Sequence, residues 1–187
     1  MKENGPDKVP QDGASIPKQE GPRDPMAGLR ADLLEKRTLL DTLGERLIAI
    51  SNQRLGDEQY GTAYKTGVPM GFRPTEAAAE ASKFAAVIEV SEALREYRKE
   101  LGSLSMGVRM DIKQVPEGER ARLQSLLDAF ALADKAAFDW SQDPDVAQIE
   151  MRGSTEGLDA DKVVDKAIRN VGREASNISS IVAGILR

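Results

Sequence analysis

The chain has 187 residues, 26 basic and 31 acidic side chains, a formal net charge of −5, and neither cysteine nor histidine. This composition excludes a Cys or His nucleophile and the usual ligands of zinc, copper and iron, so we expect no metal and no cofactor. The excess of acidic residues makes nucleic acid an unexpected partner, since binding it requires clustered Lys and Arg. No run approaches the roughly 20 apolar residues of a transmembrane segment.

The first 25 residues differ from the rest in composition. They contain five prolines, three glycines and charges of both signs, which predicts a disordered tail over 1–25. This tail is either a solubilising extension or a segment that a secretion machine or chaperone recognises. Because the start, MKENGPDKVP, has no apolar stretch, we expect no cleavable signal peptide. Absence of Cys fits both the cytoplasm and an exported chain, so the compartment stays open.

Residues 26–187 are predicted to form a single domain that begins with a long helix. Apolar residues recur in alternating three- and four-residue steps from Met26 to Ile50, which predicts a helix over 26–55. Lys36 interrupts this apolar stripe, and either reaches solvent along its stem or marks where the helix leaves its partner. Four glycines and two prolines over 56–74 predict a loop.

The centre of the chain is predicted to combine helices and strands. Apolar spacing predicts a helix over 75–102 and another over 116–140. Strict alternation predicts strands over 104–113 and 146–152, paired in parallel by a right-handed crossover. The alternative for the first strand continues the preceding helix, with Leu104, Val108 and Ile112 at four-residue steps.

A last helix is predicted over 159–186, capped by Asp159. The predicted fold class is therefore α+β, predominantly α, with long coiled-coil-like helices at both ends of a strand–helix–strand centre. An apolar stripe on such a helix must be covered, either by the chain's own first helix or by a second chain. The residues predicted to make this contact are Leu40, Leu43, Leu47, Val164, Ile168, Val171, Ile178, Val182 and Ile185.

The layout resembles the secreted needle-tip and filament proteins of type III secretion systems. The segment GLDADKVVDKAI (residues 157–168) is similar to the one that leads into the final helix of those filament proteins. The resemblance implies a structural role outside the cell, as an oligomer and without an active site. The same helices would also serve a cytosolic chaperone or adaptor, so in each case the expected partner is a protein, either a second copy or a heterologous helix.

A second resemblance is to the AroQ class of chorismate mutases, which are all-helical enzymes. LLDTLGER (residues 39–46) resembles the first-helix motif of that family, and KTGVP (65–69) with RPTE (73–76) resembles its lysine loop and the start of the next helix. The resemblance implies an active site in which Arg46, Lys65 and Glu76 take part. There Arg46 and Lys65 would hold the substrate carboxylates and ether oxygen, stabilising charge that develops in the transition state.

Overall fold

The described chain is built from helices alone. The computed structural model describes the backbone of residues 25–63 and 76–187 and the side chains of residues 26–52 and 80–187. Its elements are α1 (Pro25–Ala63), α2 (Glu76–Asp111), α3 (Glu117–Ser141), α4 (Pro144–Arg152), α5 (Ala160–Ala167), the π-helical turn η2 (Ile168–Gly172) and α6 (Arg173–Ile185). The last three elements follow one another without a break and form one continuous helical rod.

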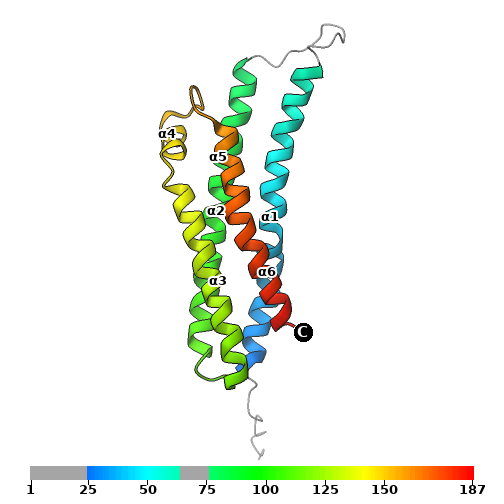
Figure 1. The fold of residues 1–187 in the computed structure, drawn as a ribbon, viewed down its shortest axis with the longest axis vertical. Helices are drawn as coiled ribbons and strands as arrows, with labels where there is room; N and C mark the ends of the chain where they lie inside the picture. The colour runs from blue at the N-terminus through cyan, green and yellow to red at the C-terminus, as the bar shows by residue number, and fades with distance from the viewer. Residues whose placement is uncertain (1–24, 64–75) are drawn as a thin grey trace, which may run out of the picture.

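The long helices form a four-helix bundle in which the rod α5–η2–α6 is the fourth member (Figure 1). α6 contacts α1 and α3, and α2 contacts the same two helices. The backbones of α2 and α6 do not approach each other closely within the described chain, so these helices lie diagonally across the bundle. Neighbouring helices run in opposite directions, and the rod runs in the same direction as α2 (Figure 1). The short helix α4 packs against α2, α3 and α5.

The apolar stripes of the four members meet in one core, as their three- and four-residue spacing requires. Tyr97, Phe130 and Trp140 are the large aromatic residues of this core, and the indole Nε1 of Trp140 donates a hydrogen bond to the carbonyl of Val163 at 2.9 Å. Lys36 reaches the bundle surface, where its Nζ lies 3.2 Å from a carboxylate oxygen of Glu100. Of the two interpretations of Lys36, the structure therefore agrees with the one in which its side chain reaches solvent along its stem.

The predicted α+β fold is wrong, because residues 104–113 continue α2 as far as Asp111 instead of forming a strand. Leu104 and Val108 are buried at a four-residue step, as the helical alternative required. Met106 and Met110, which completed the alternation, are 66% and 65% exposed. The alternating pattern therefore combined one buried row and one exposed row of the same helix.

The predicted strand over 146–152 is also wrong, because this segment is the helix α4. Asp143 caps it by accepting a hydrogen bond from the backbone N–H of Asp145 at 3.0 Å, and Pro144 occupies its first turn. Gly153, with φ of 66°, ends it in the left-handed conformation. Since neither strand exists, the crossover between them does not exist either.

The remaining boundaries agree in part. The predicted helix 26–55 runs from Pro25 to Ala63, so the loop prediction is wrong for 56–63, and residues 64–74 lie outside the described chain. The helix predicted over 75–102 begins at Glu76, and the one over 116–140 is α3. Asp159 caps the last helix by accepting from the N–H of Lys162 at 3.0 Å. Residues 1–24 of the predicted tail lie outside the described chain.

The π-helical turn η2 follows from the spacing of buried residues along the rod. One row of buried residues runs through Ala160, Val163, Ala167, Val171, Ala175, Ile178, Val182 and Ile185, and Val164 and Gly172 are buried beside this row. Three consecutive four-residue steps lead from Val163 to Ala175, whereas three turns of α-helix take about 11 residues. The wider π turn accommodates the additional residue and keeps both halves of the rod facing the core. Ala167 is fully buried, and Ile168, which the sequence placed in the stripe, is only partly buried.

Candidate functional site

The residues predicted to form an interface lie inside the bundle. Eight of the nine are buried, namely Leu40, Leu43, Leu47, Val164, Val171, Ile178, Val182 and Ile185, and Ile168 packs partly buried against the core. The stripes of α1 and of the rod therefore cover each other within one chain. Contact of these residues with a second chain stays a prediction, and it would require the bundle to open.

Of the residues predicted for catalysis, Arg46 is the one whose side chain the structure describes. Arg46 lies on α1, where its guanidinium donates to a carboxylate oxygen of Glu96 on α2 at 3.0 Å. Lys65 lies outside the described residues, and Glu76 is the first residue of α2. The pocket beside Arg46 has a volume of about 30 Å³, which accommodates one or two water molecules rather than an organic acid. A catalytic role for the three residues stays a prediction.

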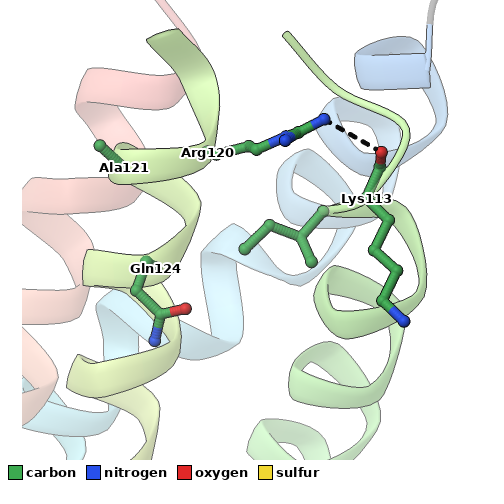
Figure 2. Close-up of a pocket in the computed structure, with 5 residues that line it drawn as sticks. Lys113, Arg120, Ala121 and Gln124 are labelled. Atoms are coloured by element: carbon green, nitrogen blue, oxygen red, sulfur yellow. Dashed lines mark hydrogen bonds between the residues drawn. The ribbon is translucent and has the colours of Figure 1, made fainter. Parts of the chain in front are cut away.

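A wider depression lies where α2 turns into α3 (Figure 2). It measures about 450 Å³ and is lined by Ile112, Lys113, Arg120, Ala121 and Gln124. Arg120 donates from its Nε to the carbonyl of Val115 at 3.0 Å and from a terminal nitrogen to the carbonyl of Lys113 at 3.3 Å. Arg120 thus provides partners for two loop carbonyls, which assigns it to stabilising the turn.

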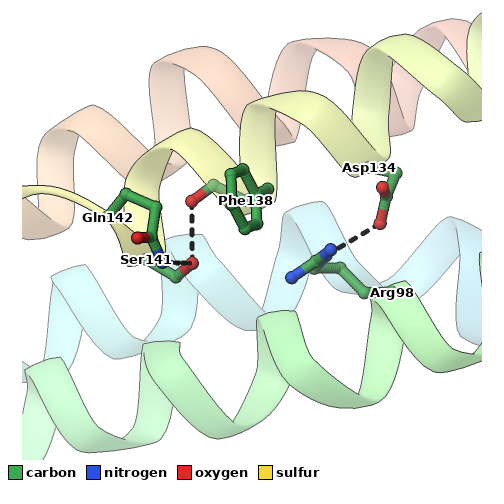
Figure 3. A network of polar contacts seen from close by, with 5 residues as sticks. All are labelled: Arg98, Asp134, Phe138, Ser141 and Gln142. Atoms are coloured by element: carbon green, nitrogen blue, oxygen red, sulfur yellow. Dashed lines mark hydrogen bonds and ion pairs between the residues drawn. The ribbon is translucent and has the colours of Figure 1, made fainter.

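A polar network joins α2 to α3 on the outside of the bundle (Figure 3). The Nε of Arg98 donates to Asp134 at 2.7 Å, and its guanidinium lies 5.1 Å from the ring centroid of Phe138. Ser141 donates to the carbonyl of Phe138 at 2.7 Å, near the end of α3. The ion pair and the cation–π contact hold the two helices together.

Two carboxylates fix the connection between α4 and α5. Glu80 on α2 accepts from the hydroxyls of Thr155 at 2.5 Å and Ser154 at 3.3 Å, and the Thr155 hydrogen bond is the main reason that its pKa lies below the usual range. Burial raises the pKa of Asp143, but hydrogen bonds from Lys166 and from the backbone outweigh it, so this pKa too is lowered. Both groups are structural in the described chain.

The most distinctive surface is a row of cations on the rod, the basic stripe, formed by Lys162, Lys166, Arg169 and Arg173. Their steps of four, three and four residues place them on one face of a helix, and all four are exposed. Lys166 also donates to Asp143, and Arg173 lies 2.9 Å from Glu174. Lys162 and Arg169 form no ion pair with any described residue.

The acidic residues of the rod are less exposed than this stripe, and Glu174 forms an ion pair with its Arg173. Asp161, Asp165 and Glu174 are each partly buried, and Asp161 lies 3.8 Å from Lys83 of α2. From Ala160 to Arg187, every charged residue that is exposed is basic. Sequence reasoning missed this surface, although the spacing of the four cations was visible. The acids interleaved among them hide the separation of charge until the packing shows which face lies outward.

The described residues contain no group of three or more His, Cys, Asp or Glu side chains arranged to hold a metal ion. None of the described helices is long and apolar enough to cross a membrane. No protein-family model matches this chain, and neither a curated protein nor a solved structure is significantly similar to it. The charged outer surface is therefore the candidate functional site of the described chain.

Proposed function

We propose that this protein is a non-enzymatic subunit of a protein assembly, and that it binds an acidic surface of its partner through the basic stripe. One observation carries the proposal: every exposed charged residue from Ala160 to Arg187 is basic, in a chain whose net charge is −5. Segregation of one sign of charge on a single face favours a partner of the opposite sign.

The shape of the stripe favours a helical partner. From Lys162 to Arg173 the rod rises by about 16 Å, and the cations lie in a nearly straight row along it. A partner helix with carboxylates at steps of three and four residues presents a matching row. The other exposed residues of the rod are Asn170, Ser176, Asn177, Ser180 and Gly184, none of them aromatic or large and apolar. This surface therefore lacks the side chains that stack on bases or enter a lipid interface.

In this proposal the assembly forms through charged outer faces of the bundle and not through the apolar stripes predicted from the sequence. The apolar stripes, with Leu43, Ile178 and Val182, are buried within the chain, so they are not free to hold a second one. A filament-type role of the kind suggested by the layout would therefore use the outer faces of the bundle. Exposed ion pairs are individually weak, so we expect binding to depend strongly on salt.

The test uses a synthetic helical peptide with four Glu residues at steps of four, three and four, and a matched peptide with Gln in their place. Fluorescence anisotropy compares the full chain with the double variant Lys162→Gln and Arg169→Gln. Neither side chain has an ion-pair partner in the described chain, so the fold should be kept. A second double variant, Arg95→Gln and Lys99→Gln on α2, removes the same charge from another helix.

We expect the stripe variant to bind the Glu peptide about tenfold more weakly, because two exposed pairs contribute about 1–2 kcal/mol. The control variant should bind like the wild type, and the Gln peptide should not bind. Equal loss in both variants would mean that only the net charge matters, and the proposal would be abandoned.

A further inference from the structure

The outer face of α2 carries a row of carboxylates, the acidic stripe, formed by Glu89, Glu92 and Glu96, with the exposed cations Arg95 and Lys99 beside it. All three side chains are exposed. Glu96 accepts from Arg46 at 3.0 Å, whereas Glu89 and Glu92 form no ion pair with any described residue. Their steps of three and four residues are the same as those from Lys166 to Arg169 and from Arg169 to Arg173.

The two stripes lie at the same height along the bundle. The ion pair between Lys83 and Asp161, at 3.8 Å, fixes the level of α2 against that of the rod, and both run in the same direction. Glu89, Glu92 and Glu96 follow Lys83 by 6, 9 and 13 residues, while Lys166, Arg169 and Arg173 follow Asp161 by 5, 8 and 12 residues. Each carboxylate is therefore within one residue, or about 1.5 Å of rise, of its basic counterpart.

The two stripes also face away from each other. The backbone of α6 approaches those of α1 and α3 closely but not that of α2, and α5 packs on α2 with its buried side, which includes Val163 and Val164. In Figure 1 the upper part of the rod, α5, passes in front of α2. A copy placed beside the molecule without axial displacement would bring its acidic stripe to the basic stripe of the first.

We propose that the acidic partner is a second copy of this chain, with the basic stripe of one copy along the acidic stripe of the next. This inference rests on the proposed function and names its partner. The pairs are Lys166 with Glu89, Arg169 with Glu92 and Arg173 with Glu96, between parallel helices. Because the two surfaces differ and lie on opposite sides, the contact is head-to-tail, and each added copy leaves one stripe free. Such contacts build rings or open filaments rather than closed two-fold dimers.

The test is a charge exchange followed by sedimentation velocity on the full chain at low salt. One variant carries Arg169→Glu and Arg173→Glu, and the other carries Glu92→Lys and Glu96→Lys, the two positions that face them. Each variant alone presents like charges at the contact and should sediment as a monomer at concentrations where the wild type associates. An equimolar mixture restores opposite charges at both stripes and should associate again.

Each other outcome is decisive. A mixture that stays monomeric while the wild type associates would show that another surface is used, and would overturn the inference. A wild type that binds the Glu peptide but remains monomeric would overturn the inference and leave the proposed function standing. A wild type that does neither would overturn both. If a reversed-charge variant fails to fold by circular dichroism, Arg169→Gln alone must weaken self-association, and unchanged association would count against the contact.

Discussion

At the scale of single residues, Tyr97 is the least satisfied group of the core. Its side chain is 1% exposed, and its hydroxyl has no hydrogen-bond partner among the described residues. Burial, and then the negative charge of Glu174, raise the pKa of this hydroxyl far above its usual range. A buried hydroxyl without a partner costs free energy that a phenyl ring of the same shape does not.

We therefore expect Tyr97→Phe to raise the free energy of unfolding by about 1 kcal/mol. Thr155→Val is the matched control, because the Thr155 hydroxyl is also buried but donates to Glu80. The free energy of unfolding of that variant should fall by about 1 kcal/mol, since it leaves Glu80 without this donor. Urea denaturation of both variants measures the two changes. A loss of stability in Tyr97→Phe comparable to that in Thr155→Val would contradict the assignment of Tyr97.

The carboxylates Glu80 and Asp143 make the junction of α4 and α5 sensitive to acid. Their pKa values are lowered in the folded chain, so their contribution to stability is complete above the unfolded values of about 4. It is lost as the pH falls through the lower folded values. We expect the melting temperature to fall below pH 4, and Glu80→Gln to be less stable at pH 7 and to lose less on acidification. If acidification lowered the melting temperature of Glu80→Gln as much as that of the wild type, a role for Glu80 would be contradicted.

At the scale of elements, η2 is explained by one additional residue between the two halves of the rod. Deleting the exposed Asn170 would give the row from Ala160 to Ile185 alternating three- and four-residue steps throughout. Such a chain fits a continuous α-helix, so the deletion should keep the helical circular dichroism and lower stability by less than about 1 kcal/mol.

The matched control deletes Asn177, which is exposed within the regular helix α6. This deletion rotates Ile178, Val182 and Ile185 by about 100° relative to the rest of the rod, and should unfold the protein. Thermal melts of both deletions provide the comparison. If the two deletions lowered the melting temperature equally, η2 would not be the turn that accommodates the additional residue.

The sequence predicted the long helices well because their apolar stripes extend over many turns. The prediction failed at residues 104–113, where exposed methionines and buried aliphatic residues of one helix alternate along the sequence in the pattern typical of a strand. It failed at α4 because a helix of nine residues offers only two buried positions, Val146 and Ile149, which are too few to define a period. It also placed Ile168 in the stripe, since a strict heptad gives no indication of a π turn.

In the whole molecule, the apolar stripes predicted to join two chains instead pack against each other and close the bundle of a single chain. Ile178 and Val182 lie in a core shared by α1, α3 and the rod. Replacing both with Asp would bury two unpaired charges, at a cost of several kcal/mol against a typical total of about 5–15 kcal/mol.

We expect that double variant to lose most of its helical circular dichroism, including the signal of the α2–α3 pair. A folded variant that had lost only its ability to associate would show instead that these residues form an external interface. The paired control is Ser180→Asp with Asn177→Asp on the exposed face of α6, which should stay folded.

Apolar contacts close the bundle, and we propose that charged outer stripes join one copy to the next. The most direct measurement is the sedimentation of the wild-type chain over a wide concentration range at low salt and at about 0.5 M salt, where surface pairs are screened. The account predicts concentration-dependent association at low salt that disappears at high salt. Association that persists or increases at high salt would place apolar stripes at the interface and contradict the account.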